Sequence, residues 1–462
     1  MRRWSAEQIA AAAGARVLPS ASGSGEGPER ASIDSRQAEP GVLFVGLPGS
    51  RSDGGSFASQ ALQAGAWGVL VAPQHAAAAA QAAPNGATVL AAEDPLAALQ
   101  RLATAWRRAL AAQVIGVTGS TGKTSTKDLL LGLLAPHRRT VASRANFNTE
   151  IGLPLEILSA PWGTEVLVLE MAMRGAGQIA ELARVAEPNV GVIVNVGPVH
   201  LELLGSLEAV AAAKAELIAA LPQDGTAVIP ANEPLLEPHL RRDVRTISFG
   251  GDGDVRLERV SGDRLELEVA GQRIQLEVSF AQAHMRTNLL AAVAAASAIG
   301  VVSGGRVELE LSPGRGQPVA LERGITLIDD SYNANPMSMR AALDELAASA
   351  TREQAQRRVA VLGDMLELGP EEKEFHAAVG EYAQAAGVDL LVTVGPRAAA
   401  MAERFGAETH SVLDAVQAAE LVPALIGPGD VVLVKASRGV GLELVCGALR
   451  ATPQCSAQGA GR

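Results

Sequence analysis

The sequence VIGVTGSTGKTSTK at residues 114–127 indicates a buried strand that leads through a glycine-rich turn into a helix. A phosphate loop needs this order of elements, because glycines let backbone N–H groups wrap a phosphate at the start of a helix. It also needs a lysine for the outer phosphate oxygens and a hydroxyl for magnesium. Gly119, Gly122, Lys123 and Thr124 supply these groups. The segment therefore predicts a nucleotide-binding loop.

The match to the strict pattern G-x-x-x-x-G-K-[ST] is incomplete, because Val117 occupies the position of the first glycine. The alternative is a glycine-rich turn whose lysine is there by chance. We favour the phosphate loop because the preceding strand and the following helix are predicted where the loop needs them. The predicted nucleotide-binding positions are Thr118, Gly119, Ser120, Thr121, Gly122, Lys123, Thr124 and Ser125.

Length and composition limit the possible classes of protein. The chain has 462 residues, enough for about three domains. Its 50 acidic residues exceed its 39 Lys and Arg by 11, so no overall basic field attracts nucleic acid or an anionic membrane. No stretch of 18 or more apolar residues occurs, and we expect no membrane insertion. Cys446 and Cys455 lack metal-site spacing, which fits a reducing cytoplasm.

Three series of short apolar runs divide the chain. In residues 1–108 such runs alternate with Ala-rich helical stretches, which indicates a small α/β domain. In residues 109–313, apolar runs without alternating polar residues predict parallel strands buried on both faces. In the same region, an apolar pattern with a period of two predicts an antiparallel hairpin that turns at Ala270–Gly271. Residues 314–462 hold a second parallel α/β series. The predicted fold class is therefore α/β.

A family resemblance supports this organisation. The loop variant, with Thr118 and Gly119 before S-T-G-K-T, resembles the ATP loop of the Mur ligases and of the related folylpolyglutamate synthases. The resemblance implies a three-domain Mur ligase architecture: an N-terminal UDP-sugar-binding domain, a central P-loop ATPase domain and a C-terminal Rossmann-like domain that binds a dipeptide. Six further segments resemble the Mur ligases in the same order: NFNTEIGLPL (146–155), VLVLEMAMRGAGQI (166–179), NVGPVHLELLGSLEAVAAAKAELI (195–218), IDDSYNANPMSM (328–339), VAVLGDMLELG (359–369) and VLVKASRGVGLE (432–443).

The strings DDSYNANP and LGDMLELG resemble the family member that adds a dipeptide. The resemblance then implies an ATP-dependent amide ligase of peptidoglycan precursor synthesis, which joins D-alanyl-D-alanine to UDP-MurNAc-tripeptide through an acyl phosphate. Two alternatives stay open. One is the family member that adds a diamino acid, although its DNPR motif is absent here, and the other is a P-loop nucleotide-binding module that joins nothing. We expect a cytoplasmic monomer, and the sequence does not indicate whether the tripeptide ends in lysine or diaminopimelate.

Polar residues after predicted strands are the candidate metal ligands. Glu170 ends the apolar strand VLVLE, where an acid beside a phosphate loop can hold magnesium, although a lone glutamate there is more often solvated. His200 follows NVGPV at a predicted strand end, and Lys214 lies in the next helical stretch; without context they are a loop histidine and a solvated lysine. The resemblance implies catalytic roles for Lys123, Glu170, His200 and Lys214. It also implies two Mg²⁺ ions held by Thr124, Glu170, His200 and N-carbamylated Lys214, since carbamate oxygens can ligate a dication and an ammonium cannot.

The resemblance implies nucleotide contacts for residues outside the loop. His284 and Asn288 match the family's H-N-x-x-N motif against the adenine, with Met285 in place of the first Asn. Asp330, at the end of ITLID, would accept the ribose hydroxyls. The alternative for Asn288 is a helix N-terminal asparagine that satisfies backbone donors, and the alternative for Arg315 is a surface arginine in a hinge loop. The predicted set is Asn146, His284, Asn288, Arg315, Asp330 and Asn333.

Four residues are predicted to contact the substrate. Ser35 and Arg36 lie in a segment that resembles a uridine-nucleotide domain, and the forked donors of arginine suit a diphosphate. The alternative is a solvated D-S-R turn. Asn148 and Thr149 would lie near the phosphates, but polar side chains there could equally cap a helix.

Overall fold

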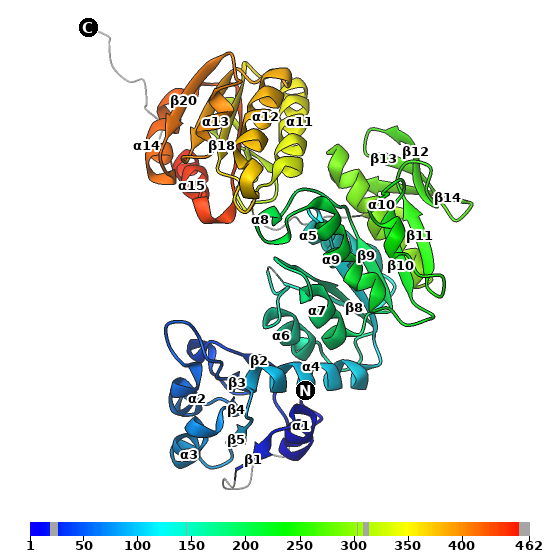
Figure 1. Ribbon diagram of the computed structural model, residues 1–462, viewed down its shortest axis with the longest axis vertical. Helices are drawn as coiled ribbons and strands as arrows, with labels where there is room; N and C mark the ends of the chain where they lie inside the picture. The colour runs from blue at the N-terminus through cyan, green and yellow to red at the C-terminus, as the bar shows by residue number, and fades with distance from the viewer. Residues whose placement is uncertain (19–25, 145, 303, 308–313, 452–462) are drawn as a thin grey trace. The chain divides into compact units, whose positions relative to one another are not determined.

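Figure 1 shows the computed structural model, which describes residues 1–18, 26–144, 146–302, 304–307 and 314–451. The described residues form three β-sheets of five, ten and six strands, with helices packed against each sheet. The predicted α/β class is confirmed. The predicted boundaries at 108/109 and 313/314 stay predictions.

Contacts divide the chain into two compact units. The N-terminal and central sheets belong to the first unit, and the C-terminal sheet belongs to the second. The second unit also takes two short stretches from the middle of the chain, and one of them contains His200. The first unit comprises residues 1–196, 211–281 and 285–309, and the second comprises 197–210, 282–284 and 310–462.

The N-terminal sheet has the order β1-β5-β4-β3-β2, with β2 to β5 parallel and β1 antiparallel to β5. Every residue of β3, β4 and β5 is buried, as expected for parallel strands covered on both faces. The elements are α1 (Ala6–Ala13), β1 (Arg16–Val17), β2 (Arg30–Ser32), β3 (Val42–Val45), α2 (Ala58–Gln63), β4 (Gly68–Val71), α3 (Pro73–Ala82), β5 (Thr88–Ala91) and α4 (Pro95–Leu110).

The central sheet positions the phosphate loop. Its order is β15-β14-β13-β12-β11-β10-β9-β6-β8-β7, and β7 to β11 and β6 run parallel. Its strands are β6 (Gln113–Thr118), β7 (Thr140–Ala142), β8 (Val166–Glu170), β9 (Val190–Ile193), β10 (Thr226–Pro230), β11 (Arg245–Phe249), β12 (Val255–Ser261), β13 (Arg264–Val269), β14 (Gln272–Val278) and β15 (Gly305–Val307). Its helices are α5 (Lys123–Leu134), α6 (Gly152–Ser159), α7 (Gln178–Ala186), α9 (Leu207–Ala219) and α10 (Ala283–Ala298).

One predicted turn and one predicted strand end can be compared directly with the central sheet. The β13–β14 hairpin turns at Ala270 and Gly271, both with positive φ, so that prediction is confirmed. The strand before His200 is shorter than predicted, because β9 ends at Ile193 and residues 194–199 form a loop. His200 itself precedes the short helix α8 (Leu201–Leu204). The apolar pattern GVIVNV does not reveal this end, since Val194 and Val196 are also buried.

The C-terminal sheet has the order β16-β17-β21-β18-β19-β20, parallel except for β16. Side chains of α11, α12 and α13 form an apolar core on one face, and those of α14 and α15 form another core on the opposite face. The elements are β16 (Gln317–Ala320), β17 (Thr326–Asp329), α11 (Pro336–Glu353), β18 (Arg357–Gly363), α12 (Glu372–Ala385), β19 (Leu390–Val394), α13 (Ala399–Ala402), β20 (Glu408–Val412), α14 (Ala415–Leu425), β21 (Asp430–Lys435) and α15 (Glu443–Ala451).

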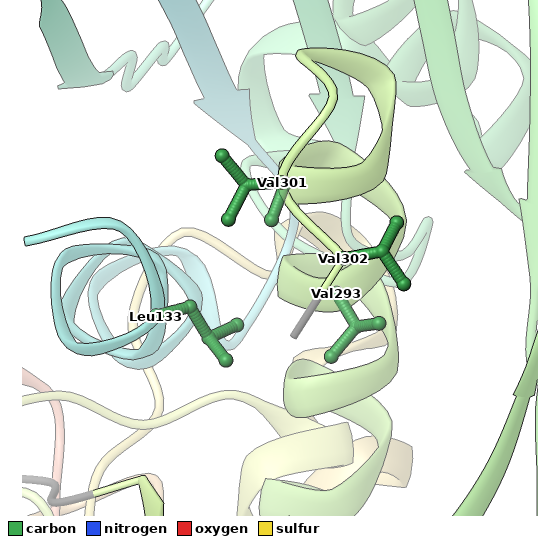
Figure 2. Close-up of a pocket in the computed structure, with 5 residues that line it drawn as sticks. Leu133, Val293, Val301 and Val302 are labelled. Carbon is green, nitrogen blue, oxygen red and sulfur yellow. The ribbon is translucent and has the colours of Figure 1, made fainter. Parts of the chain in front are cut away.

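An apolar pocket opens between α5 and the end of α10 (Figure 2). Leu133, Val293, Ala296, Val301 and Val302 line it, and none of these side chains can donate or accept a hydrogen bond. The pocket therefore offers no polar side chain to a phosphate, and the polar residues Lys123 and Thr124 lie at the other end of α5.

The structure also shows the character of the helices and the state of the cysteines. Within the described ranges, no helix combines the length and the apolar character needed to span a bilayer. Cys446 is a buried free thiol, and Cys455 lies outside the described residues.

Trp106 on α4 is the largest fully buried side chain and provides a stability test of the first unit. Its ring lies 5.2 Å from that of Trp4 and 5.9 Å from that of Trp162, and its Nε1 donates to Ala160 O at 3.0 Å. We expect Trp106→Ala to lower the free energy of unfolding by about 3–5 kcal/mol, because the cavity removes ring contacts and a hydrogen bond. Circular dichroism during chemical denaturation measures this loss. Trp106→Phe keeps a ring and should cost about 1–2 kcal/mol; equal losses in both variants would contradict the packing role.

Candidate active site

The phosphate loop joins β6 to α5 at the carboxyl edge of the central sheet. Gly122 has φ +76°, and a Cβ there would lie 2.4 Å from Asn288 Oδ1, so a side chain would be strained and would collide. Thr118 Oγ1 is buried and has no hydrogen-bond partner among the described residues. Asn288, which is predicted to lie against the adenine, therefore packs closely against Gly122 of the loop.

Asn195 fixes the loop from the end of the neighbouring strand β9. Its Oδ1 accepts from Thr121 N–H at 2.9 Å, and its Nδ2 donates to Thr121 Oγ1 at 2.9 Å. Its carbonyl accepts from Ser120 N–H at 3.2 Å. Sequence reasoning did not single out this residue. The available signal was its place after β9, because neighbouring parallel strands end at the same edge of a sheet.

Lys123 is the first residue of α5. Its Nζ donates to Gly119 O at 2.7 Å, so the ammonium lies over the loop that precedes its own helix. The helix N-terminus and the ammonium both favour an anion at this point.

Glu170 joins two other predicted residues beside the loop. Its carboxylate, on a residue only 2% exposed, accepts from Thr124 Oγ1 and from Asn148 Nδ2, each at 2.8 Å. Hydroxyl and carboxylate oxygens are ligands that Mg²⁺ accepts. Among the residues that the structure describes, no cluster of three His, Cys, Asp or Glu side chains could hold a metal. The Glu170 carboxylate and the Thr124 hydroxyl are the candidate ligands here, and Mg²⁺ typically adds substrate phosphates and water to one or two carboxylates.

Asn146 and Thr149 do not share this contact. Both are exposed, and Thr149 Oγ1 accepts from Gly152 N–H at 3.4 Å near the start of α6. The Thr149 hydroxyl therefore contacts the first residue of α6, while Asn148 lies against the metal-binding candidate Glu170.

Lys214 on α9 is 2% exposed, which contradicts the alternative of a solvated lysine. Burial, and secondarily the positive charge of Lys123, lower the pKa of the Lys214 amine well below its ordinary value. No acidic group is among the causes of this shift. A neutral amine adds carbon dioxide more readily than an ammonium does, so the environment suits the predicted carbamate.

His200 lies in the second unit, whereas Lys214, its predicted partner, lies in the first. His200 has φ +54° and its Nδ1 pairs with Glu367 Oε2 in the LGDMLELG segment. Glu202 N–H also donates to Glu367 O at 3.3 Å. Sequence reasoning did not single out Glu367, which is 167 residues from His200.

Asp330 follows β17 and pairs with a lysine that sequence reasoning missed. Lys435 Nζ donates to Asp330 Oδ2 at 2.6 Å and to Asn333 O at 2.8 Å. Lys435 ends β21, the strand hydrogen-bonded to β17. The structure therefore brings together the residues predicted for ribose and base, Asp330 and Asn333, by means of a buried ammonium.

The remaining predicted residues lie at the surface or half-buried. Arg315 stacks on Tyr332, with its guanidinium carbon 3.9 Å from the ring centre, and the guanidinium of Arg438 is 5.4 Å from the same centre. His284 is an exposed residue of the second unit. Ser35 and Arg36 lie in a short 3₁₀ turn, where the Arg36 side chain is 84% exposed and pairs with Asp34 at 2.8 Å. The D-S-R turn that sequence analysis considered is therefore present, with its arginine accessible.

Comparison with protein families gives three matches in sequence order. Residues 30–112 match the profile described as Mur ligase family, catalytic domain. Residues 117–296 match the Mur ligase middle domain, and residues 314–438 match the Mur ligase, glutamate ligase domain. The matches include the phosphate loop and the paired Asp330 and Lys435.

Curated relatives named UDP-N-acetylmuramoyl-tripeptide–D-alanyl-D-alanine ligase match along most of the chain. The protein of Mycobacterium tuberculosis H37Rv is 38% identical, with 92% of each chain covered. That of Bacillus subtilis 168 is 36% identical, over 89% of this chain and 90% of the relative. That of Escherichia coli K12 is 32% identical, over 91% of this chain and 94% of the relative.

Solved structures of MurF also match. The Acinetobacter baumannii MurF crystal structure gives a TM-score of 0.83 at 28% identity and covers 97% of this chain and 99% of that one. The Thermotoga maritima MurF in complex with ADP gives a TM-score of 0.78 at 30% identity and covers 91% of this chain and 97% of that one. The likeness therefore extends over the residues of all three sheets.

Asn195→Ala tests whether the strand-end amide fixes the phosphate loop. The change removes the side-chain hydrogen bonds to Thr121, so we expect the affinity for ADP to fall by roughly 10-fold to 100-fold. Isothermal titration calorimetry measures the affinity, and Lys123→Ala, which removes the ammonium itself, is the reference for severe loss. Unchanged ADP affinity in folded Asn195→Ala would show that the loop does not depend on Asn195.

Proposed function

The chain belongs to the Mur ligase family, and we propose that it is the member that joins D-alanyl-D-alanine to UDP-N-acetylmuramoyl-tripeptide. The observation that carries this proposal is the likeness, over about nine-tenths of both chains, to curated ligases of that name. The phosphate loop with Thr124 bonded to Glu170 supports the use of ATP, as does the ADP complex of the Thermotoga relative.

The reaction forms an amide in two steps. The terminal carboxylate of the tripeptide attacks the γ-phosphorus of ATP, which forms an acyl phosphate and releases ADP. The amine of D-alanyl-D-alanine then attacks the acyl carbon, the C–N bond forms, and phosphate leaves while the amine loses a proton. An acyl phosphate hydrolyses in water, so the site has to exclude water between the two steps.

The loop residues supply binding and charge neutralisation. Backbone N–H groups at the start of α5 and the Lys123 ammonium would hold the β- and γ-phosphates. Thr124 and Glu170 would hold Mg²⁺, which supplies positive charge to the phosphoryl oxygens when bound. Asn148 keeps the Glu170 carboxylate oriented by donating to its second oxygen.

The proposal also assigns nucleotide and substrate contacts to the other predicted residues. Asp330 and Asn333 would meet the ribose and the base, Asn288 and His284 the adenine, and Asn146 and Arg315 the nucleotide. Ser35 and Arg36 would meet the UDP-sugar, and Asn148 and Thr149 the substrate near the phosphates. The buried Lys435 supports the ribose contact, because its hydrogen bond holds Asp330 in one orientation.

A second Mg²⁺ held by His200 and carbamylated Lys214 completes the proposed site. A buried amine near Lys123 supports the carbamate, since burial and the neighbouring charge favour the neutral amine that adds carbon dioxide, and the modification supplies an anionic oxygen ligand. We also propose that the protein is cytoplasmic. The use of ATP and the buried free thiol of Cys446 support this location. We also propose a monomer, which sedimentation equilibrium tests.

The acceptor identifies the reaction. With ATP, Mg²⁺ and UDP-MurNAc-tripeptide, D-alanyl-D-alanine should stimulate phosphate release about a hundredfold more than single amino acids do, because the site must hold both residues of the dipeptide. Mass spectrometry identifies the joined product. Faster turnover of a diamino acid with UDP-MurNAc-dipeptide would assign the other ligase activity, and phosphate release without a joined product would indicate a non-ligating nucleotide-binding module.

The carbamate at Lys214 has a spectroscopic test. Protein equilibrated with ¹³C-labelled carbon dioxide should show a carbamate carbon resonance that disappears in Lys214→Ala, and this variant should be nearly inactive because the metal loses a ligand. Added acetate or formate should restore part of the activity, since a short carboxylate can occupy the position of the carbamate. An identical spectrum of the two proteins would exclude the modification.

A further inference from the structure

We propose that Lys127 is a positioning residue for Glu170, which it reaches through Ser143. Neither residue is among the predicted site residues. The inference rests on the proposed function in one respect, namely that Glu170 holds magnesium beside ATP. Lys127 and Ser143 would hold the backbone of Glu170 in place before the metal binds.

Lys127 is an ammonium inside the protein. It lies one turn after Lys123 on α5 and is 4% exposed. Its Nζ donates to Ser143 O at 2.8 Å and pairs with Asp128 Oδ1 at 2.5 Å. Burying an ammonium is costly unless its donors are used, and an apolar side chain would fill the same volume without that cost. We therefore attribute the lysine at this position to the contacts of its amine with Ser143 and Asp128.

Ser143 connects this ammonium to the metal-binding candidate. It follows β7, and its N–H donates to Val168 O on β8 at 2.9 Å. Its hydroxyl accepts from Glu170 N–H at 2.8 Å and donates to Val168 O at 3.3 Å. Lys127 thus fixes the carbonyl of a residue whose hydroxyl fixes the backbone of Glu170.

Helix α5 consequently contacts the end of β8 in two ways. Thr124 donates directly to the Glu170 carboxylate, and Lys127 acts on the Glu170 backbone by way of Ser143. Arg144, which follows Ser143 in the chain, is fixed as well, because its backbone N–H donates to the buried Glu156 carboxylate at 3.1 Å. Groups that orient a metal ligand typically contribute a factor of about 10 to 100 to metal affinity.

The test separates metal binding from nucleotide binding. A fluorescent ADP analogue is titrated against the full-length protein, first in EDTA and then at increasing Mg²⁺. We expect Lys127→Met, which has a similar length but no donor, to raise the Mg²⁺ concentration for half-maximal enhancement of binding about 10-fold to 100-fold. Affinity in EDTA should change by less than about twofold, because the phosphate loop is intact.

Two further variants keep the result interpretable. Ser143→Ala removes the hydroxyl that accepts from Glu170 N–H and leaves the buried ammonium in place, so it should shift the Mg²⁺ requirement in the same direction even if Lys127→Met fails to fold. Leu133→Ala is the matched control: this buried residue of the same helix lines the apolar pocket in Figure 2, and its loss lowers stability without touching the hydrogen bonds.

The outcomes are distinct. A shifted Mg²⁺ requirement in Lys127→Met and Ser143→Ala, with none in Leu133→Ala, supports the positioning role. An unchanged requirement in both variants, or an equal shift in Leu133→Ala, would overturn it. If the wild-type protein does not bind the ADP analogue at all, the proposed function fails instead.

Discussion

The hydrogen bond from Thr124 to Glu170 is the contact on which the rest of the site depends. It joins the first turn of α5 to the last residue of β8, and it is possible because β6 lies between β8 and β9 with all three strands parallel. Parallel strands bring their carboxyl ends to one edge, so the loop after β6, the carboxylate of β8 and Asn195 after β9 meet there. A strand order in which β8 or β9 did not neighbour β6 would separate them.

The sequence predicts the parts of this site that are local. Glycines, Lys123 and Thr124 lie within six residues of one another, so their pattern is sufficient to predict the loop. Glu170 ends an apolar run, but only the family resemblance indicates a metal ligand there, since a lone glutamate at a strand end is more often solvated. The groups that orient these residues are not local. Asn195 is 74 residues from Thr121, and Lys435 is 105 residues from Asp330. Such pairs are set by strand order, which the apolar pattern does not encode.

His200 shows a different limit of sequence reasoning. The run GVIVNV is apolar well beyond Ile193, because the residues that follow β9 are buried by packing and not by strand pairing. The predicted strand was therefore too long. Lys214 shows the opposite error. A lysine in a helical stretch indicates a solvated residue, and only the surrounding fold buries this one. Burial of a single polar side chain depends on its neighbours in space.

The segment 197–210 belongs to the second unit, although it lies in the chain between β9 and α9 of the first. Its ties are the His200–Glu367 pair, the Glu202–Glu367 hydrogen bond and the close approach of Gly197 to Met337. The second unit is consequently discontinuous in sequence, and a gene fragment that begins at residue 310 would encode only part of its contacts. Its apolar cores would be complete, but the loop around Glu367 would lack the chain that covers it. Anyone who dissects this protein by expression of separate domains should therefore graft residues 197–210 onto the C-terminal fragment.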